Sequence, residues 1–318
     1  MAHKMASTIH PVVMYPFKQP RELESLDLLY SHLKGLGEDD RFGEPVTIVN
    51  NQTKYQNSKP REVKSPARSK AFHEAISDIV KPVSKVTSVW SVDTCSMWLH
   101  GLGDAFEKAR VSGDNHDVFW LIPGDFDFTT SSGRAALEKL ASIPESVYAG
   151  DCDICLGEID VPVNSAKQLI DTYGTYGLLY NWFPAEAQGI RKITSKPRTE
   201  FFAISYRTLD TALIDSRWYA YEQTLMILLQ NMKGSDTVLP ILSEHLGEIS
   251  DEESTRSSLS SAMQQVERTE RALKLFWREK AESEGRDDWY DEFRVLSSQS
   301  ESIRTAAMVI LRRLLPPK

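Results

Sequence analysis

The fold of this chain is indicated most clearly by the stretch Asp117-Val-Phe-Trp-Leu-Ile-Pro-Gly-Asp125-Phe-Asp127-Phe128. Its first half is an apolar run, which is typical of a strand buried on both faces. Two aspartates follow at the carboxyl end, and we expect them to face the same way because side chains alternate along a strand. Such a pair can share Mg²⁺ or Mn²⁺, which takes oxygen ligands and commonly also binds substrate phosphates. The alternative is a solvated turn in which Asp127 caps the following helix.

Short β-branched runs alternate with longer amphipathic stretches over the first two thirds of the chain. This pattern predicts an α/β fold with a mainly parallel sheet flanked by helices. We expect strands at 11–15, 46–50, 86–92, 117–122, 154–161 and 200–206, and helices at 22–34, 67–80, 96–111, 134–141 and 165–182. The segment 54–70 has six Lys or Arg residues and two prolines, so we expect a loop, either a solvated linker or a flap over an anionic ligand.

The strand pattern disappears after Ser254. Apolar residues then recur at helical spacing, namely Leu259, Met263, Val266, Leu273 and Trp277. We therefore expect a sheet domain over 1–250 and a helical C-terminal region over 251–318. One isolated helix cannot bury such a stripe, so it must pack on the sheet domain or on a second copy of the chain, which makes a homo-oligomer one expectation.

Composition excludes several classes of protein. Of the 318 residues 41% are hydrophobic and 26% are charged, the balance of a soluble globular protein. The net charge of −8 argues against a general nucleic-acid binder, and the longest apolar stretch is too short to cross a membrane. Three cysteines in a long chain without a secretory signal pattern predict a reducing compartment, which we take to be the cytoplasm.

The segment before the aspartates is a small-residue stretch, 96–113, that ends in glycine four residues before the strand. Together the two segments resemble the family-2-like glycosyltransferases of the GT-A fold, in which such a helix leads into a strand ending in a metal-binding Asp-x-Asp motif. The segments 11–16 and 46–53 are similar to the first two strands of that fold. The resemblance implies a hexosyltransferase-like enzyme that uses Mg²⁺ or Mn²⁺ to move a sugar from a nucleotide-sugar donor to a hydroxyl of a small-molecule or glycan acceptor.

The resemblance also implies where the donor binds. It places the metal on Asp125 and Asp127, and the nucleotide on Tyr15, Pro16, Asn50, Gln52 and Asp93. Asp93 would accept hydrogen bonds from a base edge, although its type and position suit the N-cap of the following helix equally well.

Residues of the later chain are candidates for the transfer step. Lys196 and Arg198 could place positive charges beside a diphosphate, and Glu200 could place a carboxylate beside the acceptor. The alternative is that all three lie in a solvated loop. Glu222 would remove the proton of the acceptor hydroxyl if the transfer inverts the anomeric configuration. The alternative is that its negative charge only stabilises the N-terminus of a helix. His245 would be a third metal ligand, or an ordinary surface residue.

Three further motifs are less specific. Tyr173, Tyr176 and Tyr180 share a helical stripe that is either core or a platform for a sugar, and two glycines between them permit close approach of another element or ligand. The CxxC pair at 152 and 155 lacks partners for zinc and is interpreted as two buried thiols. The Asp-Asp-x-x-Asp at 287–291 is interpreted as an exposed acidic turn between helices.

Two other functions remain open from the sequence. One is a sugar-phosphate nucleotidyltransferase on a related sheet, which the absence of a Gly-rich, Arg-containing loop at 14–20 disfavours. The other is a non-catalytic protein that binds sugar nucleotides or acts as a scaffold.

Overall fold

The fold is described from a computed structural model. The description covers residues 8–15, 23–50, 55–56, 59–60, 78–89, 117–162, 165–214, 222–249 and 259–314. The chain forms two compact units. The first comprises 1–157, 200–216 and 240–246, and the second comprises 158–199, 217–239 and 247–318.

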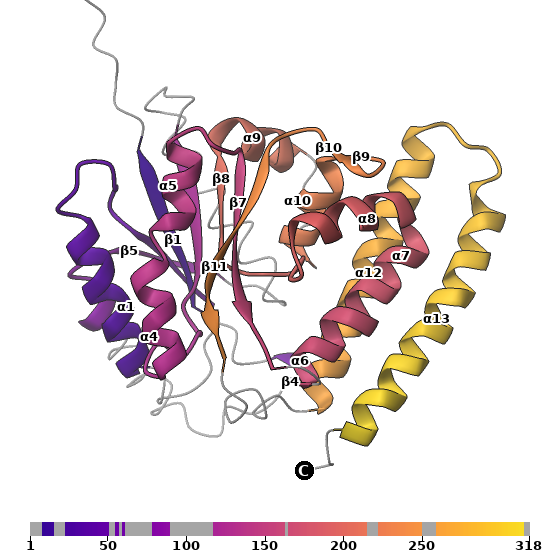
Figure 1. Cartoon of the computed structure of the whole chain (residues 1–318), viewed down its shortest axis with the longest axis horizontal. Coiled ribbons are helices and arrows are strands. Elements are labelled where there is room, and N and C mark those ends of the chain that lie inside the picture. The colour runs from indigo at the N-terminus through magenta and orange to yellow at the C-terminus, as the bar shows by residue number, and fades with distance from the viewer. Residues whose placement is uncertain are drawn as a thin grey trace, which may run out of the picture. The chain divides into compact units, whose positions relative to one another are not determined.

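A seven-stranded sheet runs in the order β11-β7-β8-β6-β1-β2-β5 (Figure 1). Its strands are β1 (Ile9–Tyr15), β2 (Val46–Asn50), β5 (Lys85–Val89), β6 (Val118–Pro123), β7 (Ile154–Asp160), β8 (Phe202–Ser205) and β11 (Ile241–Glu248). The six strands predicted from the sequence are all present, β2 with the predicted bounds and the other five with shifted ends. The seventh, β11, was not predicted, and it lies at the edge of the sheet.

Four neighbouring strands, β6, β1, β2 and β5, pair in parallel. Every residue of β6 is buried, which confirms the predicted strand with both faces covered. Strand β8 pairs antiparallel with β6 and with β7, so the sheet is mixed on that side. The α/β class with a mainly parallel sheet is therefore confirmed, with the antiparallel β8 as the departure from it.

The helices of the first unit are α1 (Leu23–Leu36), α4 (Ser131–Lys139), α5 (Ser142–Tyr148) and α9 (Tyr206–Ile214). Helix α1 buries Leu26, Leu29, Tyr30 and Leu33, the spacing of one helical face. Helices α4 and α5 follow one another along the sheet (Figure 1), and α5 packs on β6 and β8. Helices α5 and α9 were not predicted from the sequence. Tyr206, the first residue of α9, was expected to end a strand.

The second unit is mainly helical. One continuous helical stretch consists of α6 (Ala166–Leu169), the π-helix η2 (Ile170–Tyr176) and α7 (Gly177–Trp182). It is followed by α8 (Pro184–Ile193), α10 (Gln223–Gln230), α12 (Leu259–Ser283) and α13 (Trp289–Leu314). This unit also contains a short hairpin of β9 (Met232–Lys233) and β10 (Asp236–Thr237).

The first unit contains a second short hairpin, formed by β3 (Tyr55–Gln56) and β4 (Lys59–Pro60). This hairpin lies inside the loop expected at 54–70.

The apolar stripe predicted after Ser254 packs within its own unit. Val266, Leu273 and Trp277 of α12 are buried, and α12 contacts α13, η2 and α7. A Cβ added to Gly174 would lie 2.7 Å from Val266 Cγ2, so this glycine allows η2 to approach α12 closely, as the sequence suggested.

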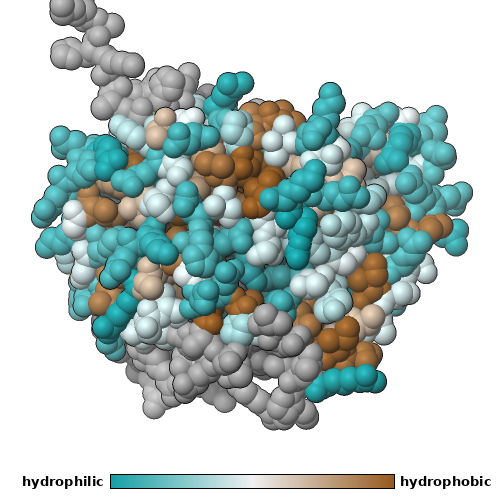
Figure 2. Space-filling model, in the orientation of Figure 1, coloured by the Kyte–Doolittle hydropathy of each residue, from teal (hydrophilic) through white to brown (hydrophobic). Residues whose placement is uncertain are grey.

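The face drawn in Figure 2 is mostly polar among the residues that are coloured. Figure 2 shows hydrophilic side chains over most of the visible face, with hydrophobic ones in small groups. Among the described helices, none combines the length and apolar character that a bilayer crossing requires. The acidic motif 287–291 is the exposed turn before α13 and that helix's first residues, so the predicted interhelix turn is confirmed.

Candidate active site

The carboxyl ends of three adjacent parallel strands meet at one edge of the sheet. Tyr15 ends β1 beside Val49 of β2, and Met14 pairs with Pro123 of β6. Asn50 ends β2, and Asp125 follows β6 by two residues. The structure therefore brings the backbone positions of Tyr15, Asn50 and the Asp-x-Asp motif together, at the edge where open α/β sheets bind ligands.

The two aspartates lie in a turn rather than in the strand. The β1 pairing continues only to Gly124, whose N–H donates to the Met14 carbonyl oxygen at 2.6 Å. Residues 124–128 then turn towards α4. Strand alternation therefore does not orient Asp125 and Asp127, and that part of the sequence argument was wrong.

The turn around Asp127 is held by its own side chain. Asp127 is exposed, and its Oδ1 accepts hydrogen bonds from the Thr129 N–H at 3.1 Å and hydroxyl at 2.5 Å. Thr130, not Asp127, caps α4, because its hydroxyl accepts from the Gly133 N–H at 3.0 Å. The alternative in which Asp127 caps the helix is therefore wrong.

Ser25 of α1 fixes the same turn from the other side. Its hydroxyl donates to the Phe126 carbonyl oxygen at 2.7 Å and accepts from the Phe128 N–H at 2.8 Å. Ser25 is 3% exposed, so both hydrogen bonds are shielded from water. One buried serine thus clamps the backbone on both sides of Asp127. Sequence reasoning missed it, because only its position on the apolar face of α1 distinguishes it from a surface serine.

Gly133 allows α4 to lie against this turn. A Cβ at Gly133 would overlap the Asp127 carbonyl oxygen and lie 2.8 Å from Phe128 Cα, both backbone atoms that cannot rotate away. Gly133→Ala is therefore expected to lower the free energy of unfolding by about 1–3 kcal/mol, despite alanine's better helix propensity. Urea denaturation measures this change in the free energy of unfolding.

The matched control is Gly35→Ala on α1, where a Cβ would meet nothing within 4 Å. That substitution is expected to leave stability unchanged or to raise it by up to about 1 kcal/mol. Equal stability of the Gly133→Ala variant and the unchanged chain would contradict the close packing of α4 on the turn.

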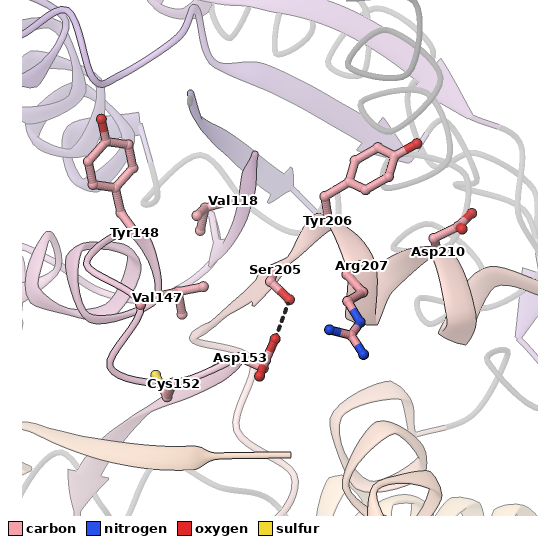
Figure 3. Close-up of a pocket in the computed structure, with 10 residues that line it drawn as sticks. Val118, Val147, Tyr148, Cys152, Asp153, Ser205, Tyr206, Arg207 and Asp210 are labelled. Atoms are coloured by element: carbon pink, nitrogen blue, oxygen red, sulfur yellow. Dashed lines mark hydrogen bonds between the residues drawn. The ribbon is translucent and has the colours of Figure 1, made fainter. Parts of the chain in front are cut away.

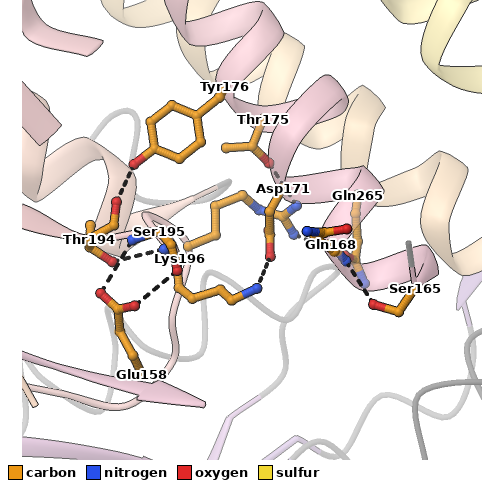
Figure 4. A network of polar contacts seen from close by, with 11 residues as sticks. Glu158, Ser165, Gln168, Asp171, Thr175, Tyr176, Thr194, Ser195, Lys196 and Gln265 are labelled. Atoms are coloured by element: carbon orange, nitrogen blue, oxygen red, sulfur yellow. Dashed lines mark hydrogen bonds and ion pairs between the residues drawn. The ribbon is translucent and has the colours of Figure 1, made fainter. Parts of the chain in front are cut away.

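In the second unit the segment 194–199 is held by polar contacts (Figure 4). Lys196 Nζ lies 3.0 Å from Asp171 Oδ2, and the Ser195 hydroxyl donates to Glu158 Oε2 at 3.0 Å. The Tyr176 hydroxyl donates to the Thr194 carbonyl oxygen at 2.5 Å. The expectation that Lys196 lies in a solvated loop is wrong, since its side chain is only 15% exposed.

Arg198 pairs with Glu222 in the same unit. Arg198 Nε donates to Glu222 Oε2 at 3.0 Å, and Arg268 Nε lies 3.6 Å from Oε1. The side chains of Arg198 and Glu222 are 13% and 7% exposed. Glu222 precedes the first residue of α10 but makes no capping hydrogen bond there. Its carboxylate therefore pairs with two guanidinium groups, and its place at the N-terminus of α10 also agrees with the helix-terminus alternative.

Two of the remaining predicted residues are exposed, and the others lie outside the described residues. Glu200 is exposed just before β8. His245 is exposed on β11, and its carbonyl oxygen accepts from Lys139 Nζ at 3.4 Å. Pro16, Gln52 and Asp93 lie outside the described residues, as do residues 67–77 and 96–111 of two predicted helices.

The predicted tyrosine stripe is only partly buried. Tyr176 is buried, whereas Tyr173 and Tyr180 are 49% and 42% exposed. The rings of Tyr176 and Tyr180 are neighbours, with their centroids 6.2 Å apart. Cys152 and Cys155 are buried free thiols, as the sequence predicted.

The architecture matches a known class of enzyme fold. The chain is similar in structure to mannosyl-3-phosphoglycerate synthase from Rubrobacter xylanophilus, with a TM-score of 0.52 and 10% sequence identity over 88% of this chain and 76% of that chain. The chain thus has the fold of GT-A glycosyltransferases, as the Asp-x-Asp stretch indicated.

A second similar structure is glucosyl-3-phosphoglycerate synthase from Mycobacterium tuberculosis in complex with Mg²⁺ and uridine diphosphate. Its TM-score is 0.49 at 12% identity, over 84% of this chain and 78% of that chain. No family model matches the sequence, and no curated protein matches it either.

Proposed function

We propose that this chain is a metal-dependent glycosyltransferase that moves a sugar from a nucleotide-sugar donor to a hydroxyl of a small-molecule or glycan acceptor. The observation that carries the proposal is the Asp125-Phe-Asp127 turn at the carboxyl end of β6, in a chain with the GT-A fold. The donor nucleotide would lie along the ends of β1 and β2, on Tyr15, Pro16, Asn50 and Gln52, with Asp93 at its base.

The residues of this turn suit a divalent cation. Two carboxylates are the oxygen ligands that Mg²⁺ or Mn²⁺ prefers, and the Asp127 turn is fixed by Ser25 before any ion binds. When bound, the cation would neutralise the charge of the departing diphosphate. His245 is proposed as a third ligand and Glu200 as an acceptor contact.

Residues of the later chain are proposed for the remaining roles. Lys196 and Arg198 are proposed to neutralise diphosphate charge, which requires them to leave or share their carboxylate partners Asp171 and Glu222. Glu222 Oε1 is buried without a hydrogen bond in the described part of the chain, so this oxygen is the proposed proton acceptor of an inverting transfer.

The cellular location and assembly are proposals of the same kind. The free state of Cys152 and Cys155 agrees with the cytoplasm as the proposed location. A second copy of the chain is proposed as a partner.

A thermal-shift panel tests the proposal. We expect one of UDP, GDP or ADP, or one of their sugars, to stabilise the protein only when Mn²⁺ or Mg²⁺ is present. A ligand at 100 times its dissociation constant adds about 2.7 kcal/mol of stability. Stabilisation by none of these nucleotides with either metal would contradict the proposal. Release of pyrophosphate from a nucleoside triphosphate and a sugar phosphate would favour the nucleotidyltransferase instead.

A further inference from the structure

A cavity lies in the first unit, at the end of the strands opposite to Asp125. Its volume is about 500 Å³ (Figure 3). Val118, the first residue of β6, lines it, together with the residues before β7, the end of α5 and the first turn of α9. Strand β6 is six residues long, so Val118 at its start lies roughly 20 Å from the Asp-x-Asp turn that follows its end. This cavity is therefore distinct from the proposed donor site.

Opposite charges line this cavity without pairing. Figure 3 shows the Arg207 guanidinium and the Asp153 carboxylate directed towards the same space. In the described part of the chain no ion pair or hydrogen bond joins the Arg207 side chain to Asp153 or to Asp210, which also lines the cavity. Arg207 and Asp210 are three apart on α9, a spacing at which ion pairs commonly form.

Asp153 keeps one carboxylate oxygen available. Its two hydrogen bonds, from the hydroxyls of Ser205 at 3.0 Å and Thr208 at 3.5 Å, both end on Oδ1. These bonds fix the direction of the carboxylate, so Oδ2 is preorganised. Two valines, Val118 and Val147, form an apolar part of the lining and are 1% and 6% exposed.

We propose that this cavity binds a small zwitterion of the α-amino acid type. The ligand's carboxylate would pair with Arg207 and its ammonium group with Asp153 and Asp210, while an aliphatic side chain packs on Val118 and Val147. A zwitterion satisfies both charge signs at once, and each contact is a charge-assisted hydrogen bond. A phosphate dianion fits less well, since it would face two carboxylates for one guanidinium.

Alkylation of Cys152 can report whether this cavity is occupied. Its thiol lines the cavity and is 4% exposed, so an occupant would cover the approach to it. The hydrogen bond from Cys155 lowers the pKa of Cys152, whereas the same hydrogen bond and burial raise the pKa of Cys155. Cys152 is therefore the more readily alkylated thiol of the pair.

The test measures alkylation of Cys152 in the full-length protein by N-ethylmaleimide, read by peptide mass spectrometry, with L-valine, L-leucine or L-methionine as probes. We expect at least one probe to slow labelling of Cys152 at least threefold, and its binding by calorimetry to be saturable. The matching amino acid amide, which lacks the carboxylate, and the N-acetyl derivative, which lacks the ammonium group, are expected to bind at least tenfold more weakly.

Arg207→Met is expected to weaken binding of the same probe at least tenfold. Arg134→Met, at an exposed arginine of α4 outside the cavity, is the matched control and is expected to leave binding unchanged. Protection by none of the three amino acids, equal binding of the amide, equal loss in both arginine variants, or protection by inorganic phosphate instead would each overturn the proposal.

Discussion

Asp127→Asn is expected to abolish metal-dependent nucleotide binding while leaving the melting temperature of the ligand-free protein almost unchanged. The asparagine oxygen can still accept the hydrogen bonds that Thr129 donates to Asp127 Oδ1, so the turn is retained. The negative charge that attracts a divalent cation is lost. We expect the affinity for the nucleotide in the presence of Mn²⁺ to fall at least about 100-fold, measured by calorimetry.

Asp27→Asn is the matched control, because Asp27 is an exposed aspartate of α1. It removes the same charge from the same unit and is expected to change nucleotide affinity less than twofold. Full metal-dependent binding by the Asp127→Asn variant would remove the metal role of this turn.

The central strands could be predicted because burial dominates their sequence. All of β6 is buried, so its apolar run is continuous, and β2 was predicted to the residue. Strand β11 could not be found in the same way. It is an edge strand, and only Ile241 and Leu246 are buried, five residues apart, so no period of two is visible.

The candidate site was predicted only in outline. The sequence located Asp125 and Asp127 after a central strand, but the geometry of that turn depends on Ser25, about 100 positions earlier. The pairing of Arg198 with Glu222 likewise joins residues 24 positions apart through tertiary packing. Periodicity and local motifs carry no information on such contacts, whereas they do on strands and helices.

Glu222→Gln is expected to destabilise the protein because it breaks the Glu222–Arg198 ion pair. The substitution keeps the side chain's shape but leaves two neighbouring guanidinium groups without a compensating charge. Breaking a buried ion pair costs about 3–5 kcal/mol, and because Arg268 is 36% exposed we expect the lower end, about 3 kcal/mol. Urea denaturation measures this loss. The matched control is Glu301→Gln, whose pair with Arg304 is 71% exposed at the glutamate and should cost less than about 1 kcal/mol.

The same variant tests the proposed proton acceptor. If Glu222 removes the acceptor's proton, transfer by folded Glu222→Gln protein falls by roughly 10²-fold or more while donor affinity persists. A double-mutant cycle with Arg198→Gln separates this from anchoring, since the double variant should be less destabilised than the sum of the two single variants. Additive losses would exclude the ion pair as the source of stability. Retention of the anomeric configuration in the product, observed by NMR, would exclude Glu222 as the proton acceptor. Its role would then be to hold Arg198 in place.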